Sequence, residues 1–201
     1  TALRNGDRRA FEAALAQKDA ANARGYAGWT PLMYASFYGD VNSVRSLLEK
    51  GADANARNDA GATALMYAAA NEEKTRLLLD HNADPNVRSG EGRTALLIAV
   101  GRPDSYPAVK LLLERGADIK PQLPDGRGVL TLAIGSRDPQ LLQLLLDRGA
   151  QQKPLPLSAS LVNCISCFDL LLKVAEPADL GAALQGAIRS DLTRLNLLLE
   201  K

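Results

Sequence analysis

The sequence predicts an all-α repeat solenoid, a stack of short helix pairs joined by projecting loops, because three markers keep one period. The turn Gly51-Ala52-Asp53 is followed by similar turns at 82–84, 116–118 and 149–151, at intervals of 31, 34 and 33 residues. Leucine clusters precede these turns at 47–48, 77–79, 111–113 and 144–146. The third marker is the Thr-Pro-Leu of residues 30–32, which is matched by Thr-Ala-Leu at 63–65 and 94–96.

The first helix of a unit is predicted over residues 31–38. Thr30 is a suitable N-cap, because its hydroxyl can accept a hydrogen bond from a free backbone N–H. Pro31 fits the first helical position, where no N–H is needed. Gly39 is expected to end the helix by adopting a left-handed conformation.

The second helix of the unit is predicted to begin at Val41. Val41, Val44, Leu47 and Leu48 recur at a spacing that places their side chains on one helical face. Gly51 then ends this helix. Because neither short helix can bury its apolar stripe alone, we expect neighbouring units to cover it by stacking.

An extended loop follows the second helix of each unit. Asp53 and Asn55 suit a tight turn, because such side chains bond to their own backbone. A glycine then recurs before each new first helix, as the turn of a projecting hairpin requires, at Gly28, Gly61, Gly92 and Gly126. Each unit is therefore predicted as helix, turn, helix and hairpin loop.

On these residues the sequence resembles the ankyrin repeat family, whose units have about 33 residues and a T-P-L-H-x-A signature. Residues 28–32 and 51–53 carry the resemblance, which is strongest over residues 24–153. The signature histidine is replaced in all four units, by Met33, Met66, Leu97 and Thr131. In this family that histidine forms structural hydrogen bonds, so its loss is expected to affect local rigidity rather than the fold.

The whole chain, 1–201, is predicted to form a single ankyrin repeat domain. A partial repeat at 1–24 precedes full repeats at 25–57, 58–88, 89–120 and 121–153. The leucine spacing then shrinks to 26 and 27 residues, which predicts two degenerate repeats without hairpins, 154–176 and 177–201. Incomplete repeats at both ends suggest a segment of a longer protein, and the Ala-, Leu- and Arg-rich loops favour a bacterial source.

The composition excludes several classes of protein. The 24 basic and 23 acidic residues give a net charge of +1, whereas non-specific nucleic-acid binding needs a concentrated positive surface. No apolar run approaches the roughly 20 residues of a membrane-spanning helix. Hydrophobic residues make up 46% of the chain, which is typical of a folded protein. We therefore expect neither nucleic-acid binding nor membrane insertion.

Cys164 and Cys167 form a C-x-x-C pair, a spacing found in redox pairs and in half of some metal sites. Alignment of the repeats places both in the first turn of an outer helix, and no second C-x-x-C follows. Helix packing is therefore the better account of these cysteines. If they are unpaired they favour a reducing compartment, and a cytoplasmic location is the resulting expectation.

The sequence lacks the motifs of catalytic and cofactor-binding sites. His81 falls at the end of an outer helix, where a cation interacts well with the helix dipole, and it has no cluster of ligands around it. The Asp-Gly-Arg-Gly of residues 125–128 lacks the G-K-[ST] of a phosphate loop and falls at a hairpin. We therefore expect no enzymatic activity, no cofactor and no metal site.

The resemblance implies a partner-binding surface, because ankyrin proteins usually meet their partners at the hairpin tips and the inner helices of a concave groove. Five of the nine aromatic residues lie in the first full repeat, and arginines recur further along the same face. Tryptophan, tyrosine and arginine are enriched at binding hot spots. Placed by position, the candidate binding residues are Tyr26, Trp29, Phe37, Tyr38, Arg93, Arg102 and Arg127.

The leading hypothesis is a protein–protein interaction module or scaffold that binds a protein or peptide through this groove. A groove that is aromatic at one end and basic at the other suits a partner with an apolar anchor followed by acidic residues. Packing is an alternative for the aromatics, since Tyr34 and Tyr67 occupy equivalent inner-helix positions, and Phe37 and Tyr38 are placed to cover the first-helix edge. The alternative function is a regulatory or targeting segment of a larger enzyme or transport protein.

Overall fold

The computed structural model describes residues 20–153, 155–157 and 164–181. Helices are the regular elements of these residues, and no strand is assigned within them. The chain divides into two compact units, Thr1–Asp118 and Ile119–Lys201, which are described one at a time. Most of the predicted partial repeat at 1–24, and most of the shortened repeat at 177–201, lies outside the described residues.

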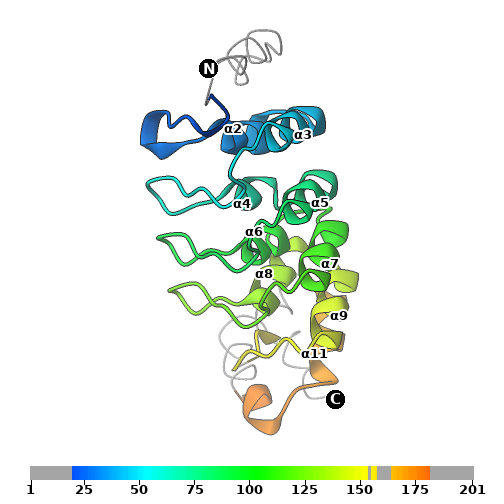
Figure 1. Ribbon diagram of the computed structural model, residues 1–201. Helices are drawn as coiled ribbons and strands as arrows, with labels where there is room; N and C mark the ends of the chain where they lie inside the picture. The colour runs from blue at the N-terminus through cyan, green and yellow to red at the C-terminus, as the bar shows by residue number, and fades with distance from the viewer. Residues whose placement is uncertain (1–19, 154, 158–163, 182–201) are drawn as a thin grey trace. The chain divides into compact units, whose positions relative to one another are not determined.

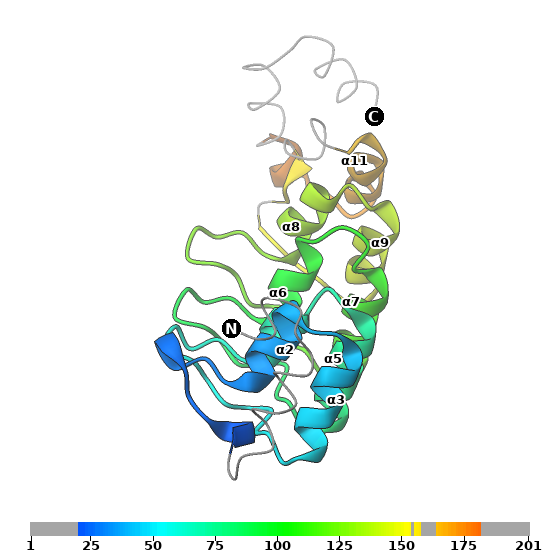
Figure 2. The same ribbon diagram turned by 90° about the horizontal axis from the view of Figure 1, so that it is seen from above.

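The first unit contains three helix pairs, one in each of the first three predicted full repeats. Two short 3-10 turns, η2 (Ala20–Asn22) and η3 (Tyr26–Gly28), precede α2 (Pro31–Tyr38), α3 (Val41–Glu49), α4 (Ala64–Ala68), α5 (Glu72–Asp80), α6 (Ala95–Val100) and α7 (Tyr106–Glu114). The inner helices α2, α4 and α6 lie between the projecting loops and the outer helices α3, α5 and α7 (Figures 1 and 2). Neighbouring inner helices contact one another, and so do neighbouring outer helices.

The first helix pair follows its sequence signals with one exception. The N–H of Met33 donates to Thr30 Oγ1 at 3.3 Å, and Pro31 is the first residue of α2, as predicted. Gly51 has the predicted left-handed backbone, with φ of 78°. The left-handed end predicted at Gly39 is wrong, because its φ is −85°. Glycine is favoured there for a different reason, since a Cβ would lie 2.8 Å from the carbonyl oxygen of Ala35.

The projecting loops are tight chain reversals, as predicted, although their arms form no regular strand in the described residues. In the second loop, the N–H of Gly61 donates to the carbonyl of Asn58 at 2.8 Å, and the N–H of Asn58 donates to the carbonyl of Ala62 at 3.0 Å. Successive loops are also linked, because the N–H of Gly90 donates to the carbonyl of Ala60 at 2.8 Å. The turn glycines have the required positive φ, between 71° and 82°, at Gly28, Gly61, Gly92 and Gly126.

An asparagine ladder connects each repeat of the first unit to the next. Asp53 accepts a bond from the N–H of Asn55 at 2.8 Å, as a tight turn requires. The prediction that the side chain of Asn55 bonds to its own backbone is wrong, because this side chain reaches the following repeat. Its amide donates to the carbonyl of Asn82 at 2.8 Å and accepts from the N–H of Asp84 at 2.7 Å. Two other asparagines form the same pair of bonds with the following repeat. Asn22 bonds to Gly51 and Asp53, and Asn86 bonds to Gly116 and Asp118.

The core of the first unit is built from equivalent positions of successive repeats. Leu32, Leu65 and Leu96 of the inner helices are at most 1% exposed. The residues that replace the signature histidine in these repeats are apolar and buried, namely Met33, Met66 and Leu97. Packing therefore takes the place of the hydrogen bonds that the histidine would form.

The second unit contains α8 (Val129–Ser136), α9 (Pro139–Asp147) and α11 (Ile165–Leu172). Helix α9 contacts both α8 and α11. Thr131, in place of the signature histidine, retains a polar role, because Gln152 Nε2 donates to its hydroxyl at 2.7 Å. The first half of the predicted repeat 154–176 lies largely outside the described residues, whereas its second half contains α11.

Candidate functional site

Five aromatic rings from the first two full repeats form one cluster in the first unit. The ring centroid of Trp29 lies 4.4 Å from that of Tyr67 and 4.9 Å from that of Tyr34. Phe37 packs edge to face on Tyr38 at 4.5 Å and on Tyr67 at 5.7 Å. Such pairs contribute about 0.5–1.5 kcal/mol beyond the burial of their area. The cluster therefore holds its rings in fixed orientations without a partner.

The cluster presents part of its area to solvent. Phe37 is 50% exposed and Tyr38 is 48% exposed, whereas Trp29 is intermediate between buried and exposed. Tyr26 is 91% exposed at the first loop and makes no ring contact with the described residues. The structure thus brings together three of the four predicted aromatic binding residues and leaves Tyr26 apart at the loop tip.

A groove of about 440 Å³ lies beside this cluster, between the projecting loops and the inner helices of the first unit. It falls in the size range of ligand pockets, roughly 300–1,000 Å³. Three successive repeats contribute to it. Its lining residues are Phe37, Ala60, Ala62, Met66, Tyr67, Ala70, Ser89, Glu91, Arg93, Ile98 and Arg102. Seven of these eleven are apolar or aromatic, so the groove is an apolar surface with a few polar groups.

Tyr67 joins the aromatic cluster to the groove. Asn58, which is buried, donates from its side-chain amide to the Tyr67 hydroxyl at 2.9 Å. Burial raises the pKa of the Tyr67 phenol, and the hydrogen bond from Asn58 offsets part of this rise. The phenol therefore stays neutral near pH 7, and its ring lines the groove as an uncharged wall.

The three predicted arginines differ in their surroundings. Arg93 and Arg102 both line the groove, whereas Arg127 belongs to the second unit. Arg93 is paired with Glu91 at 3.0 Å, and Arg127 is paired with Asp125 at 2.7 Å. Hydrogen bonds from the backbone N–H of Arg127, and then from its side chain, hold the pKa of the Asp125 carboxyl below its usual range. The basic stretch expected along this face is therefore reduced in charge at two of its three positions.

The sequence alone favours packing for Tyr67 and places Glu91 at a hairpin tip, but it does not single out Met66 or Ile98 as groove residues. The repeat register contained the missing signal. Tyr34, Tyr67 and Ile98 are equivalent positions on α2, α4 and α6, and both Tyr67 and Ile98 line the groove. A position that faces the groove in one repeat tends to face it in the next, so the comparison of repeats that identified Phe37 also extends to these residues.

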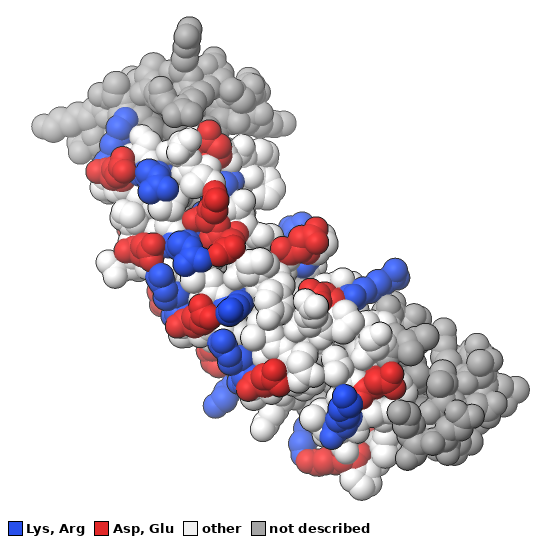
Figure 3. Space-filling view, turned by 90° about the vertical axis from the view of Figure 1, so that its right-hand side faces the viewer, with Lys and Arg blue, Asp and Glu red and all other residues white. Residues whose placement is uncertain are grey.

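The opposite side of the first unit has a mixed charge. Lys and Arg side chains alternate there with Asp and Glu side chains over the outer helices (Figure 3). Arg115 pairs with Asp80 at 2.7 Å between α7 and α5, and Arg76 pairs with Glu72 at 2.5 Å within α5. Such exposed pairs contribute little stability, and this face offers no patch of one sign.

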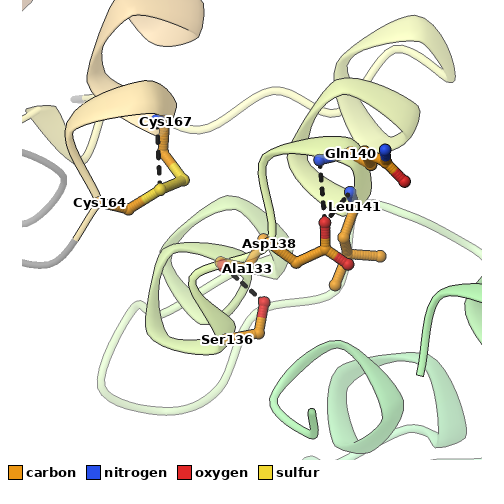
Figure 4. The surroundings of a disulfide bond; sticks show 7 residues. All are labelled: Ala133, Ser136, Asp138, Gln140, Leu141, Cys164 and Cys167. Carbon is orange, nitrogen blue, oxygen red and sulfur yellow. Dashed lines mark hydrogen bonds between the residues drawn. A yellow bond between two sulfur atoms is a disulfide. The ribbon is translucent and has the colours of Figure 1, made fainter. Parts of the chain in front are cut away.

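Cys164 and Cys167 are joined by a disulfide at the start of α11 (Figure 4). Cys164 is the N-cap of the helix, and its Sγ accepts from the N–H of Cys167 at 3.2 Å. Their predicted place at the start of an outer helix is confirmed. The premise that they are unpaired is wrong, and the argument for a reducing compartment falls with it.

No group of three or more His, Cys, Asp or Glu side chains in the described residues is placed to hold a metal ion. His81 follows the last residue of α5, and its Nδ1 lies 2.9 Å from the carbonyl oxygen of Leu77.

None of the helices in the described ranges is both long and apolar enough to cross a membrane.

Comparison with protein families agrees with the repeat architecture. Residues 55–123 match the family described as ankyrin repeats (3 copies), and residues 27–59 match a single ankyrin repeat. Comparison with curated proteins finds no match to the chain. Residues 27–123, which include all three helix pairs and the groove of the first unit, therefore consist of ankyrin repeats, and the chain is an ankyrin repeat protein.

Proposed function

We propose that the first unit binds a protein or peptide partner in its groove. Ankyrin repeats are generally protein–protein interaction modules and are typically not enzymes. The observation that carries the proposal is the combination of a groove of about 440 Å³ with the half-exposed Phe37 among its lining residues. Other large apolar side chains of this unit, such as Leu32, Leu65 and Leu96, are almost fully buried.

The aromatic cluster supports this proposal energetically. A half-exposed ring leaves apolar area in contact with water, and its burial against a partner contributes about 25 cal/mol per Å² before the entropic cost of association is subtracted. Aromatic anchors at the centre of interfaces carry much of the binding energy. Phe37 and Tyr38 are held by neighbouring rings, so little rotamer freedom remains to be lost when a partner binds.

The candidate residues take different roles in this proposal. Phe37 and Tyr38 contact the partner, and Tyr26 adds contact area at the first loop. Trp29 positions the cluster, because its ring lies against both Tyr34 and Tyr67. Substitution of either residue changes stability, but Phe37 is half-exposed and lines the groove, so it gives the more direct test of partner contact.

The test uses peptides selected from a phage-displayed random library against the wild-type protein. We expect Phe37→Ala to weaken the selected peptides tenfold or more, equivalent to about 1.4 kcal/mol, and to lower the melting temperature because its ring contacts with Tyr38 and Tyr67 are lost, while the protein stays folded at the temperature of the titration. Tyr106→Ala, on outer helix α7, is the matched control and is expected to bind like wild type. Calorimetry gives the affinities, and circular dichroism gives the melting temperatures.

Equal affinity of the selected peptides for wild type and Phe37→Ala would overturn the groove assignment. A library that yields no binder would count against it in the same way. No observation on the described residues favours a regulatory or targeting segment of a larger enzyme or transport protein over the interaction module.

A further inference from the structure

We infer that the groove selects a peptide segment with a large apolar side chain and a nearby carboxylate, and that Arg102 binds the carboxylate. The inference rests on the proposed function, since it names the chemistry of the partner for the same groove. It assigns to one arginine the role that the sequence distributed over three.

The charge of the groove comes from three of its lining residues. Its ionised lining residues are Glu91, Arg93 and Arg102. Glu91 and Arg93 neutralise each other through an ion pair at 3.0 Å. No residue within the described ranges forms a hydrogen bond or an ion pair with the guanidinium of Arg102, which is exposed. The groove therefore carries one uncompensated positive charge, at the guanidinium of Arg102.

The guanidinium of Arg102 is suited to bind a carboxylate. A guanidinium offers a planar fork of N–H donors that matches a carboxylate in two parallel hydrogen bonds. Arg93 already has a carboxylate beside it, so a partner's carboxylate would have to displace Glu91 there. Arg102 offers its donors without such competition, which makes it the favoured position for an acidic side chain of the partner.

Apolar lining residues of the groove lie next to Arg102. Ile98 lies four residues earlier on α6, and both residues line the same groove with Phe37, Met66 and Tyr67. An apolar side chain that contacts Ile98 and Phe37 is therefore close to the guanidinium. Side chains two residues apart in an extended peptide point to the same side, about 6–7 Å from each other. We expect the acidic residue within about three positions of the apolar anchor.

The experiment selects the same phage-displayed random library separately on wild type, Arg102→Glu and Arg45→Glu. Arg45 is an exposed arginine of outer helix α3, so its reversal changes the net charge equally without touching the groove. Wild type and Arg45→Glu are expected to enrich an aromatic or long aliphatic residue with Asp or Glu nearby. Arg102→Glu is expected to lose that acidic preference and to bind the wild-type peptides at least tenfold more weakly.

A second measurement separates charge from fold. Arg102→Gln removes the charge but keeps a polar side chain that can donate hydrogen bonds, and it is expected to weaken the same peptides. Its affinity should vary less with salt than that of wild type, because the charge pair that salt screens is gone. Circular dichroism of each variant reports whether the helices are retained. Because Arg102 is exposed and makes no side-chain bond with the described residues, both variants are expected to fold.

Failure of the inference and failure of the proposed function give different results. Peptides that require Phe37 but carry no acidic residue, or that bind Arg102→Glu as well as wild type, would overturn the role of Arg102 and leave the groove assignment standing. Peptides that bind Phe37→Ala as tightly as wild type would overturn both the role of Arg102 and the groove assignment. If Arg45→Glu also loses the preference for acidic peptides, the preference depends on the net charge of the protein. That result would overturn the specific role of Arg102.

Discussion

At the scale of single residues, the ends of the outer helices require a left-handed backbone conformation. The chain takes a left-handed φ after α3, α7 and α9, where glycines stand at Gly51, Gly116 and Gly149. Asn82 takes the same conformation after α5, with φ of 61°. Asparagine tolerates this region better than other side chains, but glycine adopts it without a steric penalty.

Replacing Asn82 by glycine is expected to raise the free energy of unfolding by roughly 0.5–1 kcal/mol, because it relieves the left-handed Cβ. The bond from Asn55 is kept, since the acceptor is the backbone carbonyl of residue 82. The opposite change, Gly116→Ala, is the control. A Cβ there meets no atom within 4 Å, so the expected loss of about 1–2 kcal/mol reports backbone strain alone. Urea denaturation measures both, and a less stable Asn82→Gly would contradict this account.

Lys74 is a buried cation that joins the first two full repeats. Its side chain is 9% exposed, and its Nζ donates to the carbonyls of Ser36 at 3.1 Å and Gly39 at 2.6 Å. Burial lowers the pKa of Lys74, and the charge of Asp40 offsets part of this shift. The charged amine is therefore less favourable in the folded protein than in the unfolded chain.

Stability is expected to depend on pH through this lysine. Between its lowered folded-state pKa and the ordinary value of 10.5, the unfolded chain binds more protons than the folded protein, so the free energy of unfolding rises with pH. The contribution is isolated by comparing wild type with Lys74→Met in urea at pH 7.5 and near pH 10, because the other titrating groups are common to both. The free energy of unfolding of wild type is expected to rise relative to that of Lys74→Met between pH 7.5 and pH 10. A fall relative to Lys74→Met would show that folding raises the pKa of Lys74.

At the scale of elements, side-chain bonds between neighbouring repeats hold the loops of the first unit in register. Besides the asparagine ladder, Arg57 donates from its guanidinium to the carbonyl of Arg88 at 2.7 Å, and Arg24 donates to the carbonyl of Arg57 at 3.0 Å. Each connects residues 31 to 33 positions apart. The asparagine is not continued in the next predicted repeat, where Lys120 follows Asp118 by the same two positions as Asn55 follows Asp53.

Removing one step of the ladder is expected to weaken the coupling between two repeats. Asn55→Ala deletes the bonds to Asn82 and Asp84, and its expected cost is about 1–2 kcal/mol, since a typical hydrogen bond contributes about 1 kcal/mol. Asn42→Ala, at an exposed position of α3, is the matched control and is expected to cost less than about 0.5 kcal/mol. Chemical denaturation compares the two, and equal losses would reject the ladder as a source of stability.

At the scale of the whole molecule, stability is expected to come from stacking. The described helices have five to nine residues, whereas isolated helices shorter than about 12–15 residues are marginal in water. Their apolar faces are buried against neighbouring repeats, as in the contacts of α4 with both α2 and α6. A central defect is therefore expected to spread to the repeats on either side.

Leu65→Ala tests this coupling. Leu65 is 1% exposed on α4, and its truncation is expected to cost about 2–5 kcal/mol. Hydrogen exchange should lose protection in α2 and α6 as well as in α4. Leu77→Ala, at a half-buried position of α5, is expected to cost less. Loss of protection confined to α4 would contradict nearest-neighbour coupling.

The period, the helix pairs and most of their ends could be predicted from the amino-acid sequence. Each of these depends on local signals, such as the cap at Thr30, the proline at Pro31 and the glycine at Gly51, which act within one turn of the chain. The leucine positions that form the core followed from the same register. The error at Gly39 shows the limit of such signals, since glycine was needed for a close approach to Ala35 rather than for a left-handed turn.

Contacts between side chains of different repeats could not be predicted in this way and became visible in the folded protein. The tertiary structure joined Tyr67 to Phe37 in one groove, directed Asn55 to the following repeat, paired Arg93 with Glu91 and left Arg102 without a side-chain partner in the described residues. It also joined the two cysteines in a disulfide. The physical reason is that side chains of similar sequence context acquire different neighbours once the repeats stack, and ion pairs, ring contacts and unpaired charges depend on those neighbours.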